Sequence, residues 1–361
     1  MKILIVSYGI KEYDGRLKEL GDMLANIGEV ELLCCSVEKN NGCYFLSPKN
    51  YLTRRTYMGF MRYVIEQSRR IGKIDMLVCD NLFAALPTII VRRILKPQHI
   101  IQDVRELYLF KQMHGSSKFF AFFERSLMRR ATVVLTANQE RAEIVRDAYH
   151  LNETPLVFEN VRFLEGDTTD PALREKYRGV FKYRINVLST SGLYMERDSD
   201  KLILAMKQLP SDYGLFFVGQ SSDADVEKYK QLCEQNGIDS VHLIGRVPMD
   251  ELKYIVQQCQ IGAVHYHKRN LNNLYCASGK IYEFLHEGLP IVTTENPPLK
   301  NFCDKTQTGI ADDSFHTGIR TIADRYDTYK RNVQEFMQDV SPQRYNAQVA
   351  KRVADRMRSR G

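Results

Sequence analysis

A short stretch in the last third of the chain holds a small-residue turn that is followed at once by a cation and a carboxylate. From Ser278 to Gly288 it reads SGKIYEFLHEG. The Ser278-Gly279 turn predicts a helix start, which offers free backbone N–H groups to an anion, and Lys280 adds a full positive charge there. Glu283 follows one helical turn later, where its carboxylate can accept two ribose hydroxyls. The spacing indicates a nucleotide diphosphate lying across a helix start.

Two other strand–turn–helix junctions could hold further parts of such a ligand. Gly192 permits close approach to the backbone, and Arg197, near the next helix start, can grip a diphosphate through two nitrogens. An ordinary turn with a solvated arginine is the alternative. Val247 precedes Pro248 and is therefore held extended, which leaves its main-chain groups available to a base edge.

These residues must be positioned by alternating apolar strands and amphipathic helices. In the first half, strands are expected at 2–8, 30–36, 74–79, 99–104, 132–136 and 156–158, and helices at about 15–27, 52–70, 83–95, 117–130 and 138–148. In the second half, strands at 185–190, 215–219, 241–245, 261–265 and 290–293 alternate with helices at about 198–208, 224–236, 249–257 and 279–286. The tail is helical over about 318–337 and 342–360. Such alternation predicts an α/β fold of parallel sheets covered on both faces.

The length of 361 residues suits two domains. The polar stretch 164–171 is the best linker. We therefore expect a Rossmann-like domain at 1–164, a linker at 165–183, a second Rossmann-like domain at 184–340 and a C-terminal helix at 341–361 that packs back on the first domain. Ligands bind at the carboxyl ends of strands in such sheets, so we expect the site in an interdomain cleft.

Composition is that of a globular protein, with 44% hydrophobic and 26% charged residues. The first residues turn polar too soon for a signal peptide, and no apolar run approaches the roughly 20 residues of a spanning helix. The eight cysteines have no metal-ligand spacing. These features predict a cytoplasmic protein without a metal site.

The net charge of +7 is concentrated in the first half, where residues 51–130 hold 15 Lys and Arg against 6 Asp and Glu. In the helix expected at 117–130, Lys118, Arg125 and Arg129 form a basic stripe opposite several phenylalanines. Peripheral contact with an anionic membrane at its inner face is one interpretation. An amphipathic helix with a solvated basic face is the other. No nucleic-acid module is recognisable, so nucleic acid is not expected as a partner.

Taken in order, the motifs resemble the nucleotide-sugar domain of GT-B-fold glycosyltransferases, most closely the retaining enzymes of family 4. The matching pieces are Ser191-Gly192, Arg197, Phe217-Val218-Gly219, Gly245 with Val247, Ser278-x-Lys280-x-x-Glu283 and Gly288-x-Pro290-Ile291. The resemblance covers residues 185–295 well and the rest of the chain loosely. It implies GT-B architecture, with two doubly wound parallel-sheet domains and an interdomain cleft.

The resemblance also implies a role for each matched residue. Arg197 and Lys280 would neutralise the diphosphate of a UDP- or GDP-sugar, Glu283 would bind the ribose and Val247 would meet the base, while Gly192, Ser278 and Gly279 would line the donor. Many members carry a glutamate near the transferred sugar where this chain has Tyr275. Tyr275 is therefore a candidate sugar contact. His265 and His267, which end a strand of the second domain and run into a polar loop, are two further candidates. GT-B enzymes generally need no bound metal, so neither a metal nor a bound cofactor is expected.

In the first half, the segment Asp103 to Tyr108 is similar to an Asp-x-Arg-Asp-x-Trp-Pro segment of some bacterial members, with Glu106 in place of the second Asp. Asp103 and Glu106 are candidates to orient or deprotonate an acceptor hydroxyl, and Arg105 to contact it. An ion-pair cluster that only shapes the loop is the alternative. Arg16, in an Asp-x-Arg start, is a candidate contact for donor phosphate or acceptor, whereas Asp14 could simply cap the helix.

These observations predict transfer of a sugar from a nucleotide-diphosphate sugar to a glycan or lipid-linked acceptor. Retention at the anomeric carbon and a place in surface-polysaccharide or lipopolysaccharide assembly rest on the resemblance alone. A sugar-nucleotide epimerase or hydrolase on the same fold, or a non-catalytic partner subunit, remains open. A dinucleotide oxidoreductase is disfavoured because no Gly-x-Gly-x-x-Gly follows a strand.

Overall fold

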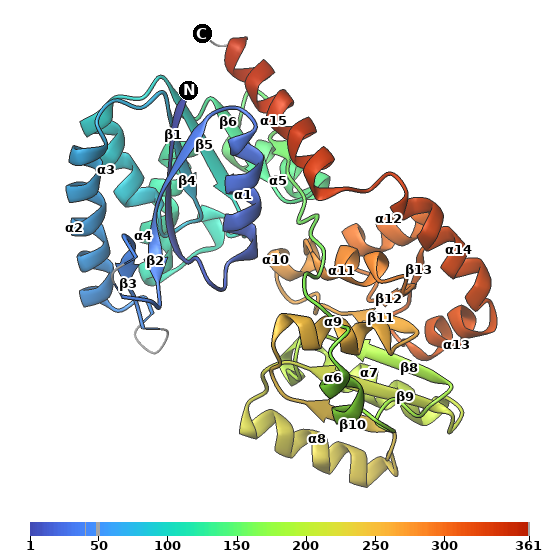
Figure 1. The fold of residues 1–361 in the computed structure, drawn as a ribbon. Coiled ribbons are helices and arrows are strands. Elements are labelled where there is room, and N and C mark those ends of the chain that lie inside the picture. Colours follow the sequence, from blue (N-terminus) through green and yellow to red (C-terminus); the bar gives the residue numbers. More distant parts are fainter. Residues whose placement is uncertain (40, 48–50, 360–361) are drawn as a thin grey trace. The chain divides into compact units, whose positions relative to one another are not determined.

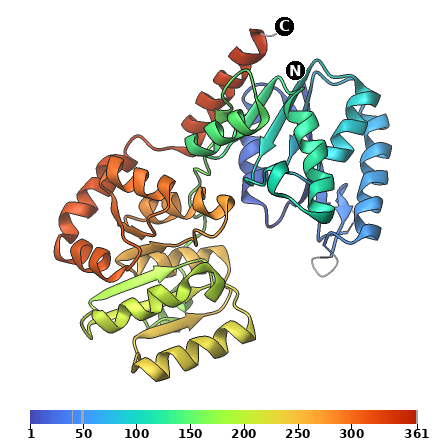
Figure 2. The same ribbon diagram turned by 180° about the vertical axis from the view of Figure 1, so that it is seen from behind.

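A computed structural model describes residues 1–39, 41–47 and 51–359. The chain forms two compact units, each built on its own parallel sheet (Figures 1 and 2). The first unit takes residues Met1–Asn160 and the C-terminal segment from Pro342, and the second takes Val161–Ser341.

The sheet of the first unit has seven strands among the described residues, in the order β3-β2-β1-β4-β5-β6-β7. They are β1 (Lys2–Ile10), β2 (Glu29–Ser36), β3 (Tyr44–Phe45), β4 (Met76–Asp80), β5 (His99–Val104), β6 (Val133–Thr136) and β7 (Leu156–Val157). All the pairings are parallel, and Asp80 of β4 lies beside both Ser7 of β1 and Asp103 of β5. This register brings the carboxyl ends of three strands to one edge.

Helices cover both faces of this sheet, as the continuous apolar strands require. They are α1 (Gly15–Ala25), α2 (Arg54–Ile71), α3 (Ala85–Leu95), α4 (Gly115–Met128), α5 (Gln139–Tyr149) and α15 (Pro342–Arg358), with a short 3₁₀ turn η2 (Phe110–Gln112) before α4. Ile3 and Ile5 of β1 share a core with Leu20 of α1 and Val353 of α15. On the other face Tyr8 meets Phe60 of α2, edge to face. The last helix of the chain is thus part of the first unit.

The sheet of the second unit has six parallel strands in the described chain, in the order β10-β9-β8-β11-β12-β13. They are β8 (Ile185–Ser189), β9 (Tyr213–Val218), β10 (Val241–Ile244), β11 (Ile261–Val264), β12 (Ile291–Thr293) and β13 (Gly309–Ala311). The order reverses between β8 and β11, because β8 pairs with β9 on one side and with β11 on the other. A switch point of this kind is where doubly wound sheets bind ligands.

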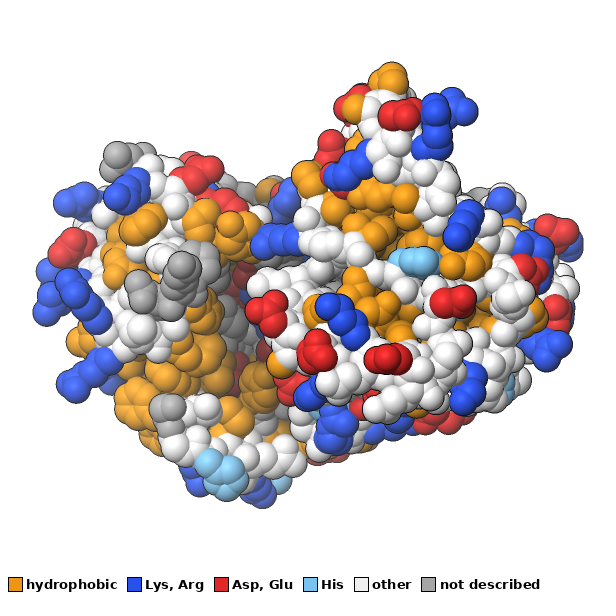
Figure 3. All heavy atoms as spheres, turned by 90° about the horizontal axis from the view of Figure 1, so that it is seen from below, with side chains coloured by type: hydrophobic (Ala, Val, Ile, Leu, Met, Phe, Trp, Pro, Cys, Tyr) orange, Lys and Arg blue, Asp and Glu red, His pale blue; other side chains and the backbone are white. Residues whose placement is uncertain are grey.

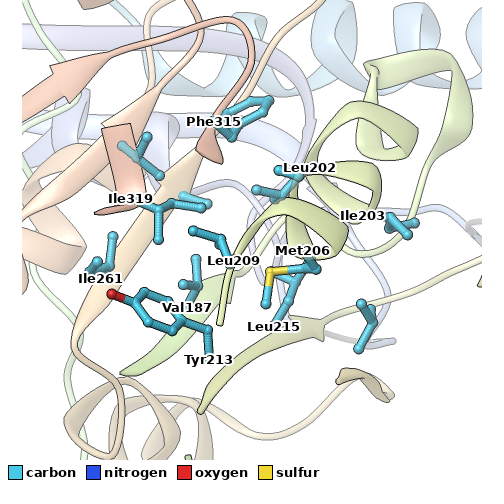
Figure 4. Packing of buried hydrophobic residues seen from close by; sticks show 14 of the residues in the cluster. Val187, Leu202, Ile203, Met206, Leu209, Tyr213, Leu215, Ile261, Phe315 and Ile319 are labelled. Atoms are coloured by element: carbon cyan, nitrogen blue, oxygen red, sulfur yellow. The ribbon is translucent and has the colours of Figure 1, made fainter. Parts of the chain in front are cut away.

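The helices of the second unit lie on both faces of its sheet. They are α6 (Pro171–Lys176), α7 (Ser199–Ala205), α8 (Asp223–Asn236), α9 (Met249–Gln257), α10 (Leu271–Leu274), α11 (Lys280–His286), α12 (Pro297–Thr306), α13 (His316–Asp324) and α14 (Tyr326–Met337), with 3₁₀ turns η3 (Met195–Arg197) and η4 (Met206–Gln208). One core joins Leu202 of α7 and Ile319 of α13 to the sheet (Figure 4). On the other face, a Cβ on Gly262 of β11 would lie 2.4 Å from the ring of Phe284. Glycine at this position therefore lets α11 approach the sheet closely.

The prediction of an α/β fold with two doubly wound parallel sheets is confirmed. Residues 165–183, assigned to a linker from their polarity, belong to the second unit instead. They include α6, whose first turn is capped by Asp170, and they place Leu173 and Tyr177 in buried positions. The unit boundary lies between Asn160 and Val161.

Candidate functional site

Helix α11 carries the cation of the candidate site. Lys280 is the first residue of the helix and is half-buried. Within the described residues its ammonium group makes no hydrogen bond or ion pair at all. Burial lowers the pKa of Lys280, although the nearby Glu283 carboxylate opposes the shift. Burying a cation without a partner reduces the free energy of unfolding. This cost is a reason to expect an anionic ligand at Lys280.

The turn before α11 adds an unsatisfied hydroxyl. Ser278 is 8% exposed, and its Oγ has no hydrogen-bond partner in the part of the chain that the structure describes. Buried polar atoms are normally hydrogen-bonded, so this oxygen is available to a ligand. α11 has only seven residues, so its dipole is small. Most of the positive potential at the Ser278 turn therefore comes from the charge of Lys280 and not from the helix start.

Glu283 lies one turn along α11 and is held by an arginine. The Nε atom of Arg162 donates to Oε1 of Glu283 at 2.6 Å, and the Glu283 side chain is 11% exposed. Oε2 of Glu283 accepts no hydrogen bond from any described residue. The carboxylate is thus fixed on one side and open on the other, as binding of a diol requires.

The turn after β8 brings two backbones unusually close. Gly192 has φ +70°, and a Cβ there would lie 2.1 Å from the carbonyl oxygen of Gln220. Gly219 has φ +130°, and a Cβ there would lie 2.9 Å from the Gly192 nitrogen. Only glycine fits both conformations without strain. The side chain of Arg197, which follows this turn, is exposed and lies over the Tyr194 ring at 5.0 Å.

His265, a candidate sugar contact, holds this turn from inside the unit. It is 2% exposed. Its Nδ1 lies 3.0 Å from the carbonyl oxygen of Arg197, and its Nε2 lies 3.1 Å from Oγ of Ser189. Because a carbonyl only accepts, Nδ1 carries the proton and Nε2 accepts from the serine; burial lowers the pKa of the ring and keeps it neutral. Both ring nitrogens are thus engaged within the unit, and His265 holds the Arg197 backbone. A contact of His265 with the sugar stays a prediction.

A hollow of about 330 Å³ opens beside the ends of β8 and β9. Its lining residues are Thr190, Ser191, Val218, Gly219, Gln220, Arg246, Val247, Met249 and Leu252. The volume is at the lower end of small-ligand pockets, which run from roughly 300 to 1,000 Å³. Its lining includes Val247, the predicted contact of the base, together with Gly219. Oγ1 of Thr190 is buried there without a hydrogen-bond partner among the described residues.

The second unit brings most of the predicted donor residues together. Glu283, Arg162 and Arg197 all contribute to the electrostatic environment of Lys280. His267 is half-buried, and its Nδ1 accepts from the Arg269 backbone at 3.1 Å. Tyr275, half-buried at the end of α10, precedes the Ser278 turn. Lys280 thus lies near two arginines and one carboxylate, and basic side chains grouped in this way can bind phosphate.

The first unit holds a network of ion pairs at the carboxyl ends of its strands. Both Nη atoms of Arg105 donate to Asp14 at 2.6 Å, and its Nε lies 2.7 Å from Oδ1 of Asp80. Asp80 is fully buried and accepts from Oγ of Ser7 at 2.6 Å. Burial raises the pKa of Asp80 to about 6, although the Arg105 charge opposes the shift. Asp14 also caps α1 by accepting from Leu17 N at 3.0 Å, so the capping interpretation holds.

Asp103 and Arg16 form a second, bidentate pair. Nε and Nη2 of Arg16 lie 3.0 and 2.8 Å from the two oxygens of Asp103, which is fully buried. Nη1 of Arg16 donates to the carbonyl oxygen of Phe158 at 2.5 Å. Both oxygens of Asp103 are thus paired with Arg16 and shielded from solvent, which favours the alternative of an ion-pair cluster. A role for Asp103 in orienting or deprotonating the acceptor hydroxyl stays a prediction. Arg16 donates hydrogen bonds to Asp103 and Phe158, which both belong to the first unit. Glu106, by contrast with Asp103, is exposed.

Sequence reasoning missed several residues of these sites. Arg162 carries no motif and lies 121 residues from its partner Glu283. Asp80 ends a buried strand beside Asp103, and strand-end position is the signal that could have found it. Within residues 1–39, 41–47 and 51–359, no three His, Cys, Asp or Glu side chains lie close enough to hold a metal ion.

The amino-acid sequence matches no protein-family model and no curated protein. Solved structures are nevertheless similar over the whole chain. HepE of Anabaena in complex with UDP has a TM-score of 0.74 at 16% identity, over 98% of this chain and 100% of that chain. Sucrose-phosphate synthase of Thermosynechococcus elongatus has a TM-score of 0.75 at 15% identity, over 100% of both chains. WaaG, a glycosyltransferase involved in lipopolysaccharide biosynthesis, has a TM-score of 0.65 at 14% identity, over 97% of this chain and 99% of that chain. At these identities the likeness shows the fold, which is the predicted GT-B fold.

Proposed function

We propose that this protein is a glycosyltransferase that moves a sugar from a nucleotide-diphosphate sugar to a hydroxyl of a glycan or lipid-linked acceptor. The observation that carries the proposal is the desolvated, unpartnered Lys280 one turn before the half-open carboxylate of Glu283. The fold supports it, since structures of similar fold were solved with UDP and with UDP-glucose. Surface-polysaccharide or lipopolysaccharide assembly is the setting we propose, as for WaaG.

In the proposed reaction the bond between the anomeric carbon and the diphosphate oxygen breaks, and its electron pair stays on the diphosphate. Lys280 and Arg197 stabilise the charge that develops there. The acceptor oxygen attacks on the same face, so configuration is retained, and its proton passes to the departing diphosphate. Because basic side chains supply the positive charge, the chemistry needs no residue to act as a metal ligand.

The donor is held in three parts. The base enters the hollow beside Val247, the ribose diol donates to Glu283, and the diphosphate lies against Lys280 and Ser278. Uracil is the base we propose first, because HepE binds UDP and UDP-glucose. Glu106, which is exposed and lies two residues after β5, is the acceptor-side carboxylate that we propose as accessible.

Thermal unfolding with a matched pair of ligands tests this assignment. Wild type should be stabilised by UDP, with about 2.7 kcal/mol at one hundred times the dissociation constant, and much less by 2′-deoxy-UDP, which lacks one hydroxyl that Glu283 would accept. In Glu283→Ala the preference for UDP over 2′-deoxy-UDP should disappear. GDP, ADP and dTDP complete the panel and identify the base.

Two outcomes would contradict the donor site. A folded wild type that none of the nucleotides stabilises lacks the site altogether. A Glu283→Ala variant that keeps the full preference for UDP shows that the ribose lies elsewhere. Glu66→Ala, which removes an exposed carboxylate from α2, is the matched control and should behave as wild type.

We also propose that α4 contacts anionic lipid, which would suit a lipid-linked acceptor. Phe119 and Phe122 are 54% and 55% exposed, and Lys118 and Arg125 lie over the Phe110 ring at 5.3 Å. Hydrophobic side chains gather on the surface of the first unit, on the left of Figure 3. In the described part of the chain every helix is too short or too polar to cross a bilayer.

Vesicle sedimentation tests this contact. Wild type should pellet with vesicles containing phosphatidylglycerol and not with vesicles of phosphatidylcholine alone, because basic residues near the surface favour anionic lipid by about 1 kcal/mol each. Phe119→Ser combined with Phe122→Ser should reduce pelleting several-fold with no change in UDP binding. Equal pelleting of wild type and double variant would show that α4 is not the contact.

A further inference from the structure

The partner of Glu283 comes from outside the sheet that carries α11. Arg162 lies in the segment between β7 and α6, and its Nε makes the 2.6 Å bond to Oε1 of Glu283. Its side chain is 36% exposed. Among the described residues, Nε is the only part of the guanidinium that makes a hydrogen bond. One charge-assisted contact therefore fixes the carboxylate and leaves its second oxygen open.

The segment that carries Arg162 is fixed to the same helix. Phe163 stacks on His286 with 3.8 Å between ring centroids and 15° between ring planes. Val161 and Leu164 are each 4% exposed. Glu283 and His286 are three residues apart and so lie on one side of α11. Arg162 is therefore held by its neighbours and does not depend on its own ion pair for its position.

Without Arg162, Glu283 would have another cation within reach. Lys280 and Glu283 are at i and i+3 on one helix, the spacing at which opposite charges pair. In the structure they make no such ion pair within the described residues, because Glu283 turns to Arg162. Pairing of Glu283 with Lys280 would occupy the cation that the diphosphate requires and the carboxylate that the ribose requires.

We infer that Arg162 is a positioning residue of the donor site: by engaging Oε1 of Glu283 it keeps Lys280 unpaired for the diphosphate and presents Oε2 to the ribose. This inference rests on the proposed function and adds a residue to it. Arg162 acts through Glu283 and Lys280 and needs no contact with the donor. The ion pair between Arg162 and Glu283 thus keeps both Lys280 and Oε2 of Glu283 available to the donor.

Binding of three ligands separates the two contacts. The ratio of affinities for UDP and 2′-deoxy-UDP reports on Glu283, and the ratio for UDP and UMP reports on Lys280. Arg162→Ala should weaken UDP binding by about tenfold, since charged neighbours in one network couple by factors from about two to about one hundred. Both ratios should fall toward one. Arg162→Lys, which keeps a cation in place, should recover part of each.

Arg178→Ala is the control, because the Arg178 side chain is 77% exposed and pairs with Glu175 on the surface; it should leave both ratios unchanged. Unchanged ratios in Arg162→Ala, or tighter UDP binding, would overturn the inference, and tighter binding would mean that Arg162 competes with the ribose. If Glu283→Ala loses the preference for UDP over 2′-deoxy-UDP but Arg162→Ala keeps it, the donor site is supported and the role of Arg162 is wrong. If wild type binds no nucleotide, both fall together.

Discussion

A Lys280→Met variant should lose two to three orders of magnitude in transfer rate and yet unfold at a slightly higher temperature than wild type. Removing one group that stabilises transition-state charge costs about 10²–10³ in rate. In folding, the same ammonium is desolvated and has no ion-pair partner among the described residues, so replacing it with an apolar chain of similar length removes a cost. Release of UDP and thermal unfolding measure the two effects.

A fall in transfer rate together with a rise in unfolding temperature distinguishes a ligand-binding lysine from a structural one. If Lys280 stabilised the fold, Lys280→Met would lower the unfolding temperature and the activity together. Lys300→Met, on α12, provides the comparison, because Lys300 is 50% exposed and pairs with Asp304 at i,i+4. It should change neither quantity appreciably.

A Glu124→Gln variant should be more stable than wild type at pH 8 by several kcal/mol, and equal to it near pH 4. Glu124 of α4 is 3% exposed, and its contact with Gln102 is a 3.4 Å hydrogen bond. Burial, helped by the charge of Asp103, raises the pKa of Glu124 to about 8. The carboxyl is therefore neutral in the folded protein at pH 7, and glutamine is its uncharged equivalent.

The sign of the pH dependence follows from this shift. An unfolded glutamate titrates near 4.3, so between about pH 4.3 and pH 8 the folded state binds the proton that the unfolded state has released. Stability from this group is complete below about pH 4.3 and is lost as pH rises toward 8. Urea unfolding at several pH values measures the slope. Glu124→Gln should make the free energy of unfolding depend less on pH, and the control Glu66→Gln should leave the slope unchanged. Equal slopes for wild type and Glu124→Gln would show that Glu124 is ionised in the folded protein.

Much of the fold follows from local pattern. The apolar strands β1, β4, β5, β8 and β11 and the amphipathic helices between them were predicted to within a few residues, because burial on both faces of a parallel sheet leaves a continuous apolar run. Elements with weak local signals were missed. β13 has three residues, and α6 lies in a polar stretch. α12 starts at two prolines, a start signal that the apolar pattern alone does not reveal.

The relative placement of two candidate residues could be predicted because one helix carries both. Lys280 and Glu283 share one helix, so their spacing places them on one side of it. The contact partners of Asp103 and His265 could not be predicted, because Arg16 and Ser189 lie 87 and 76 residues away in the sequence. Both residues end strands, where catalytic groups and buried structural pairs look alike in sequence.

The place of α15 has a consequence for how the chain is made. The first unit draws Val349, Val353 and Met357 into the same core as β1, yet these residues are translated after the whole of the second unit. Residues 1–160 leave the ribosome with the face that α15 covers still exposed to water, and the second unit is complete before that face can be buried. Order of synthesis and order of folding therefore differ: the half that begins the chain is the half whose core is finished last.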